Sequence, residues 1–127
     1  MAAMPQDPVN GDGWAIASID GLGEGPGFRK VRAPLGVTEF GVNAVVLPPG
    51  HTSRRHFHER QQELYLVLSG EIEFELSGER HTLGPGGLAR VDPPTVRSLR
   101  NTSDTDEAVY FCVGGQGGYV GRDGQAP

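Results

Sequence analysis

The sequence predicts an all-β fold, either a sandwich or a barrel, and three observations support this prediction. Short apolar runs recur along the 127 residues, and turn residues separate them. The 20 glycines and 10 prolines stand mainly between these runs, as residues that form turns. We also find no convincing amphipathic helix, because apolar residues do not recur at helical spacing. Strands with this spacing are typical of a sandwich or a closed barrel.

The chain has the length of one domain, and a chain of this size can bury roughly two-thirds of its unfolded surface. We predict a barrel domain over residues 14–114. Residues 1–13 are polar and rich in turn residues, so we expect a flexible N-terminal segment. Residues 115–127 form a glycine-rich tail, and this tail has neither a GxGxxG pattern nor a helix that could bind phosphate.

The strand predictions follow from turn residues and from alternation. Residues 64–68 and 71–76 are joined by Ser69-Gly70, which predicts a two-residue hairpin turn because glycine adopts positive φ. In 71–76, apolar and glutamate side chains alternate, so one face of that strand is buried and the other is exposed. Prolines or glycines at 48–49, 84–87 and 93–94 end other strands. In order, the predicted strands are 14–19, 28–33, 37–49, 64–68, 71–76, 80–83, 88–92, 96–101 and 108–115.

Charge and composition exclude several classes of partner. The net charge is −5, which disfavours nucleic acid and anionic membranes, and the most basic run is only Arg54-Arg55. No apolar run has the ~20 residues of a membrane-spanning helix, and no signal peptide is recognisable, so we expect a soluble cytoplasmic protein. The single cysteine, Cys112, cannot form an intrachain disulfide, and we interpret it as a small buried thiol.

The stretch from Gly50 to Gly70 carries the strongest chemical signal. His56 and His58 are two residues apart, so in an extended strand both imidazoles lie on one face. Glu63 begins the next apolar run, in phase with Tyr65 and Val67. Two imidazoles and a carboxylate with open coordination positions suit Fe(II), and also Mn, Co, Ni or Zn. Open positions are what a catalytic metal needs, since water or substrate binds there.

This stretch resembles the first motif of the cupin superfamily at every defined position, from Gly50 through the His-x-His-x4-Glu set to Gly70. A looser second motif resembles residues 87–101, in which Gly87, Pro93 and Asn101 fit. The resemblance implies a double-stranded β-helix, or jelly-roll, barrel of two sheets with a small-molecule pocket inside. It also implies a divalent metal such as Fe, Mn, Ni or Zn, and often a homodimer.

The sequence departs from the family at the fourth metal ligand. The histidine expected four residues before Asn101 is Arg97, and an ungapped alignment from the prolines places Ser98 there instead. Arginine has no lone pair for a metal. Two interpretations stay open. Either His56, His58 and Glu63 hold the metal alone and Arg97 clamps an anionic group of the ligand, or Arg97 pairs with Glu63 and replaces the metal.

Other side chains are weaker candidates for the site. Tyr65 shares a face with Glu63, so its hydroxyl either reaches the pocket and binds substrate or packs in the core. We interpret His51 as a histidine at a turn or rim, and His81 as part of a hairpin strand. Two hypotheses for the function follow. The first is a metalloenzyme of dioxygenase, isomerase or decarboxylase type that acts on a small acidic or polar molecule. The second is a non-catalytic module that binds a small acidic or sugar-like ligand. A purely structural barrel would leave the histidines and Glu63 without a role.

Overall fold

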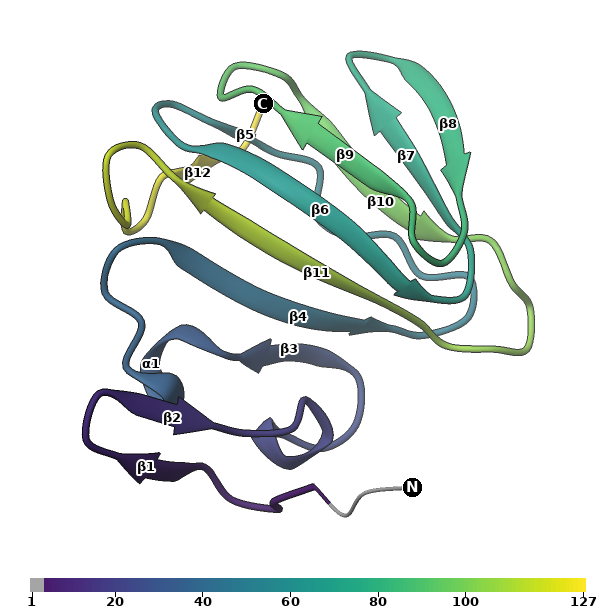
Figure 1. Cartoon of the computed structure of the whole chain (residues 1–127). Helices are drawn as coiled ribbons and strands as arrows, with labels where there is room; N and C mark the ends of the chain where they lie inside the picture. The colour runs from purple at the N-terminus through teal and green to yellow at the C-terminus, as the bar shows by residue number, and fades with distance from the viewer. Residues whose placement is uncertain (1–3) are drawn as a thin grey trace.

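The computed structural model describes residues 4–127 and confirms the prediction of an all-β protein (Figure 1). A five-stranded sheet, in the order β3-β4-β11-β6-β9, faces a three-stranded sheet, in the order β10-β7-β8, and every strand pair is antiparallel. Two small sheets, β1-β2 and β12-β5, complete the fold. The strands are β1 (Val9–Gly11), β2 (Trp14–Ile16), β3 (Gly27–Lys30), β4 (Gly41–Leu47), β5 (Phe57–His58), β6 (Gln62–Ser69), β7 (Ile72–Leu76), β8 (Glu79–Leu83), β9 (Leu88–Val91), β10 (Arg97–Asn101), β11 (Ala108–Gly115) and β12 (Gly124–Gln125).

The core lies between the two main sheets, where the alternation in the sequence places it. Ile72 and Phe74 of β7 are 0% and 1% exposed, whereas Glu73 and Glu75, which alternate with them, are partly exposed. Tyr65 and Val67 of β6 are buried in the same cluster. The buried cluster comprises Val45, Leu47, Tyr65, Val67, Ile72, Phe74, Val91, Leu99, Ala108 and Tyr110.

The predicted hairpin at Ser69-Gly70 is wrong. β6 pairs with β11 and β9, whereas β7 pairs with β10 and β8, so this dipeptide carries the chain from one sheet to the other. Gly70 has φ 75°, and a Cβ at this position would lie 2.8 Å from the Cβ of Ala108. The hairpin turn is instead the identical dipeptide Ser77-Gly78, where both residues have positive φ (49° and 84°) and Leu76 pairs with Glu79.

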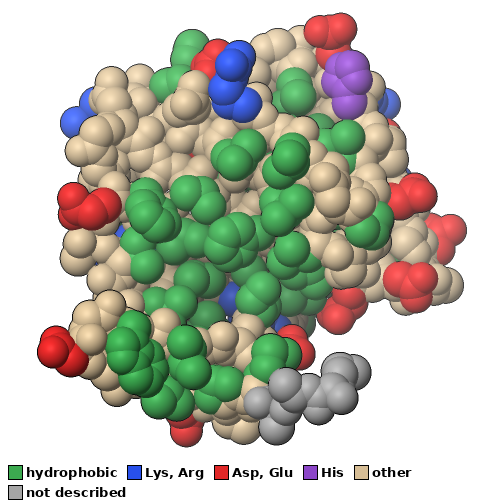
Figure 2. Space-filling model, viewed as in Figure 1, with side chains coloured by type: hydrophobic (Ala, Val, Ile, Leu, Met, Phe, Trp, Pro, Cys, Tyr) green, Lys and Arg blue, Asp and Glu red, His purple; other side chains and the backbone are tan. Residues whose placement is uncertain are grey.

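The N-terminal part of the chain packs against the outer face of β4 and β11 in the five-stranded sheet. A second cluster, built on Val31, Val42 and Ala44, packs there. The predicted strand 28–33 is only partly correct, because β3 ends at Lys30 and a four-residue helix α1 (Arg32–Leu35) follows it; the other short helix is η1 (Asp20–Leu22). Figure 2 shows hydrophobic side chains gathered over this side of the molecule.

Parts of the two flanking segments form ordered strands. Within the expected flexible segment 1–13, residues 1–3 lie outside the described residues, and Val9–Gly11 forms β1, which pairs with β2. Within the expected tail 115–127, β12 pairs with β5, so the end of the chain lies beside the histidines (Figure 1). In the described part of the chain, no helix is long and apolar enough to cross a membrane.

Candidate metal centre

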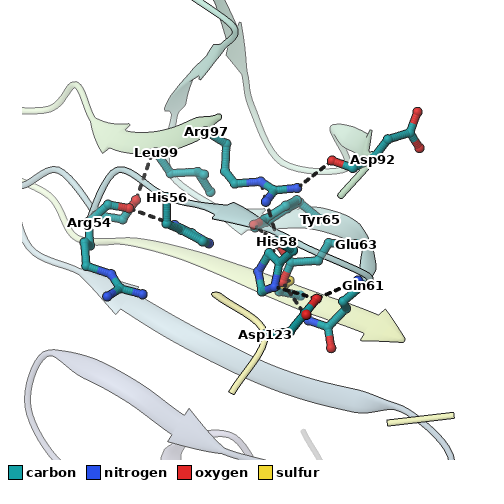
Figure 3. A network of polar contacts seen from close by, with 12 residues as sticks. Arg54, His56, His58, Gln61, Glu63, Tyr65, Asp92, Arg97, Leu99 and Asp123 are labelled. Carbon is teal, nitrogen blue, oxygen red and sulfur yellow. Dashed lines mark hydrogen bonds and ion pairs between the residues drawn. The ribbon is translucent and has the colours of Figure 1, made fainter. Parts of the chain in front are cut away.

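The structure brings His56, His58 and Glu63 together at the open end of the barrel (Figure 3). One potential ligand atom from each residue lies within 4.8 Å of the others. His58 lies on β5, Glu63 lies on β6, and His56 precedes β5 at an isolated bridge to Arg97 of β10. The closest pair is His58 Nε2 and Glu63 Oε1, 3.2 Å apart. This cluster could hold a metal ion, as its spacing in the sequence predicted.

The surroundings of His56 favour a neutral ring with a free Nε2. Its Nδ1 lies 2.9 Å from the carbonyl oxygen of Arg54. A carbonyl only accepts hydrogen bonds, so Nδ1 carries the proton and Nε2 keeps its lone pair. Burial lowers the pKa of His56 below its ordinary value, although the bond to Arg54 and the charge of Glu63 oppose the shift. A neutral imidazole with a free Nε2 is the form that binds a metal.

His58 lies between two carboxylates. Its Nε2 faces Glu63, and its Nδ1 lies 3.5 Å from Oδ2 of Asp123. Asp123 is 4% exposed, and its Oδ2 accepts hydrogen bonds from the backbone N–H groups of Arg60 (2.9 Å) and Gln61 (2.6 Å). Burial alone would raise the pKa of Asp123, but these bonds and the charges of His58 and Arg60 outweigh burial and hold the pKa below its ordinary value.

Glu63 is the most heavily hydrogen-bonded side chain of the cluster. The Tyr65 hydroxyl donates to Oε1 at 2.5 Å, and the Cys112 thiol donates to Oε2 at 3.1 Å. Gln61 Nε2 lies 3.5 Å from Oε2. Burial opposes the charge, but the contact with His58 and the hydrogen bonds from Tyr65 and Cys112 lower the pKa of Glu63 to about 2. The carboxylate is therefore ionised at neutral pH, as a metal ligand must be.

The donors to Glu63 clarify two expectations from the sequence. Cys112 is partly buried, as expected for a small thiol, and burial raises its pKa, so it stays protonated and donates to Glu63. Tyr65 is 3% exposed, lies at the cavity wall, and packs against Phe74 with the rings in an edge-to-face arrangement. Burial also raises the pKa of Tyr65. The Tyr65 hydroxyl is thus a hydrogen-bond donor to Glu63, and its predicted contact with the substrate stays a prediction.

Arg97 lies beside Glu63, at the place of the fourth ligand, and it is 0% exposed. Its Nε is 3.9 Å from Glu63 Oε1, and its Nη2 donates to the carbonyl oxygen of Asp92 at 3.1 Å. Nε and Nη1 have no hydrogen-bond partner among residues 4–127. Arg97 is not among the residues that line the cavity, because β10 and the bridge to His56 bury its side chain. The expected role of Arg97 as a clamp on the ligand stays a prediction.

A cavity of about 760 Å³ opens next to the cluster. Its walls are largely apolar residues of β3, β4 and β11, such as Phe28, Val45 and Tyr110. Two cationic side chains, Arg54 and Arg122, also line it. A Cβ placed on Gly124 would lie 3.4 Å from Arg54 Nη2, 3.5 Å from the ring of His58 and 3.8 Å from the ring of His56. The Arg54 guanidinium therefore stands close to both imidazoles.

Sequence reasoning missed several residues of this site. Asp123 and Arg122 lie in the tail, some 60 residues from the histidines in the chain, and no spacing links them to the motif. Gln61 lies between His58 and Glu63 in the sequence, where its proximity was the only signal. His51 lines the cavity, whereas His81 lies exposed on β8 opposite Phe74. Neither histidine belongs to the cluster, and the sequence had indicated both as weaker candidates for the site.

The two facing sheets and the enclosed His-x-His-x4-Glu cluster define a double-stranded β-helix barrel with a candidate metal centre. The chain belongs to the cupin domain family, because residues 43–114 match the model of that family. An oxalate-binding protein from Thermotoga maritima is 35% identical over 60 residues, which cover 47% of this chain and 50% of the relative. The chain thus spans about half the length of this curated relative.

Solved structures share the fold. A sugar phosphate isomerase of the cupin superfamily from Silicibacter pomeroyi superposes with a TM-score of 0.63 and 30% identity, covering 70% of this chain and 58% of that one. A cupin protein from Bacteroides fragilis superposes with a TM-score of 0.70 and covers 91% of this chain and 98% of its own, at 22% identity. The second likeness shows the fold alone.

Proposed function

We propose that this protein binds a divalent metal through Nε2 of His56, Nε2 of His58 and the carboxylate of Glu63. One observation carries this proposal: one potential ligand atom from each of the three residues lies within 4.8 Å of the others. The hydrogen bond between His56 Nδ1 and the carbonyl of Arg54 also leaves Nε2 of His56 free for a metal. The set of two histidines and one carboxylate suits Fe, Mn, Ni or Zn. When bound, such an ion polarises an oxygen-bearing ligand and stabilises negative charge that develops on it.

We infer that the ligand is a small acidic molecule. The cavity carries Arg54 and Arg122 near the cluster, and the negative side chains there, Glu63 and Asp123, already have partners. The relatives named above point in the same direction, since oxalate and sugar phosphates are both small anions. Arg54 would bind the anionic group, and the apolar wall would exclude water from the ligand. These features support an isomerase or dioxygenase type of enzyme, or a binding module for the same ligands.

Protein purified without chelator, or reconstituted with Fe(II), Mn(II), Ni(II) or Zn(II), is expected to contain stoichiometric metal by elemental mass spectrometry. The variant His56→Ala/His58→Ala should lose it, because a lone carboxylate is a weak site. His81→Ala is the matched control, since His81 is exposed on β8 outside the cluster. Metal that persists in the double variant, or that is absent from the reconstituted wild type, would contradict the proposal.

The variant Arg54→Gln is expected to weaken the binding of small anions by about tenfold, since a hydrogen bond to a charged group contributes about 1.5–3 kcal/mol and Arg54 is exposed at the cavity mouth. The backbone carbonyl that orients His56 is unchanged. Calorimetric titration of metal-loaded protein with oxalate and with glucose 6-phosphate measures the effect. Arg55→Gln is the control, because Arg55 pairs with Glu75 and does not line the cavity. Equal affinities in the two variants would argue against Arg54 as the anion-binding residue.

A specific observation favours a second candidate, a metal-free binding module. The guanidinium of Arg97 is fully buried 3.9 Å from Glu63 and already supplies a positive charge next to the carboxylate. In that case the same cavity binds the acidic ligand without a metal. The reconstitution experiment separates the two candidates, because a module whose Glu63 is satisfied by Arg97 takes up none of the four metals.

A further inference from the structure

The C-terminal segment, residues 116–127, runs past the candidate metal centre. β12 pairs with β5, so that Gly124 lies opposite His58 and Gln125 lies opposite Phe57. Asp123 immediately precedes β12, and its side chain is 2% exposed (Figure 3). A buried carboxylate is costly unless hydrogen bonds compensate for lost water, so its position calls for a physical reason.

The contacts of Asp123 all lead to the segment that carries the metal-binding residues. Oδ2 accepts the backbone N–H groups of Arg60 and Gln61, which lie between His58 and Glu63 in the chain. The same oxygen is 3.5 Å from Nδ1 of His58, a buried atom that makes no hydrogen bond within residues 4–127. Oδ1 faces Nε of Arg60 at 3.7 Å, but the Arg60 side chain is 63% exposed, so this ion pair contributes little to stability. Asp123 thus fixes a loop and faces the ring nitrogen of His58 that is turned away from Glu63.

We propose that Asp123 is a positioning residue of the metal centre: it holds the proton of His58 on Nδ1 and so keeps the Nε2 lone pair directed at the metal position. A carboxylate that accepts the other N–H of a metal-binding histidine fixes both the ring orientation and the tautomer. Through this contact the C-terminal segment, outside the family's matched residues 43–114, becomes part of the site. The role toward the metal rests on the proposed function, whereas the orientation of His58 does not.

The variants Asp123→Ala and Asp123→Asn together test the role. One oxygen, Oδ2, accepts the N–H groups of Arg60 and Gln61 and also faces Nδ1 of His58. An asparagine whose amide oxygen takes the place of Oδ2 keeps these contacts, so we expect it to keep the proton on Nδ1. Alanine removes the acceptor, and the ring proton then moves to Nε2, where Glu63 Oε1, 3.2 Å away, accepts it. The nitrogen that should bind metal would then carry a proton.

The protonation of His58 Nδ1 can be read without metal, from two-bond proton–nitrogen correlation spectra of 15N-labelled protein. The four histidines are assigned by the loss of signals in His58→Ala and the other single variants. We expect a proton on Nδ1 in the wild type and in Asp123→Asn, and an unprotonated Nδ1 in Asp123→Ala. An unprotonated Nδ1 in the wild type would overturn the proposal, and this measurement does not depend on whether a variant folds. An Asp123→Ala protein that keeps the wild-type pattern would also overturn it and leave Asp123 as a loop anchor only.

Zinc affinity, measured by competition with a chromophoric chelator, tests the role toward the metal. We expect about a 10–100-fold loss in Asp123→Ala, the usual effect of removing a partner that orients a metal ligand, and a smaller loss in Asp123→Asn. Asp104→Ala is the control, because Asp104 is exposed and is not part of the cluster. Unchanged affinity in Asp123→Ala would overturn this role. A wild type that binds no zinc but shows the Nδ1 proton would refute the proposed function and support the orientation of His58 by Asp123.

Discussion

Replacing Arg97 with methionine is expected to lower the free energy of unfolding of the metal-free protein by about 3–5 kcal/mol. The side chain is 0% exposed and is the largest fully buried side chain of the described residues. Its removal leaves Glu63, itself 7% exposed, as a buried carboxylate without a nearby arginine. The carbonyl of Asp92 also loses a donor. Urea unfolding in the presence of a chelator measures the effect.

A double-variant cycle shows whether the pair itself is responsible. Glu63→Gln alone should also destabilise, since it leaves the Arg97 guanidinium buried with only the bond to Asp92 and a neutral amide. The combination Glu63→Gln/Arg97→Met should recover much of the loss, because no buried charge remains at the pair. If the two single effects simply add in the double variant, the charges are not coupled, and the account of Arg97 as the partner of Glu63 fails.

The same variant reports on the metal. Zinc should stabilise Arg97→Met more than it stabilises the wild type, because the cation replaces the missing charge beside Glu63 and no longer meets the arginine. The shift in the midpoint of thermal unfolding with added zinc, compared with the shift in the wild type, measures this difference. No shift in either protein would favour the metal-free candidate.

Local sequence patterns predicted those features of the fold that depend on residues close together in the chain. Period-two alternation placed Ile72 and Phe74 in the core and Tyr65 beside Glu63, because neighbouring side chains of a strand lie on opposite faces. The pairing of strands is decided by contacts distant in the chain. Ser69-Gly70 and Ser77-Gly78 are the same dipeptide, yet one joins two sheets and the other forms a hairpin. Nothing local distinguishes them.

The candidate site likewise has features that the sequence predicted and features that it did not. The spacing of His56, His58 and Glu63 places three ligand atoms together because β5 and the start of β6 lie next to each other in the chain and in space. The orientation of the imidazoles depends on a backbone carbonyl and on Asp123, and neither has a signature in the sequence. The sequence placed Arg97 near the site in both open interpretations, and the structure puts it 3.9 Å from Glu63, but its complete burial could not be predicted from one strand.

Restoring a histidine at position 97 is expected to raise metal affinity by about 100-fold, or about 2.8 kcal/mol. Arg97→His adds a third imidazole, and thus a fourth ligand, where the guanidinium now stands 3.9 Å from Glu63, and it removes a positive charge that repels any bound cation. A chelator competition with zinc measures the gain, and the visible spectrum of the Co(II)-loaded variant should change because the number of nitrogen ligands changes.

Ser98→His is the matched control for this gain. The alternative alignment placed position 98 in the motif, but adjacent residues of β10 point to opposite faces, and Arg97 is the one beside Glu63. A histidine at position 98 should therefore leave affinity unchanged. A gain from Ser98→His and none from Arg97→His would mean that the register of β10 against the metal centre is wrong. A gain from neither variant, in a protein that binds metal through His56 and His58, would mean that position 97 lies outside the reach of the metal.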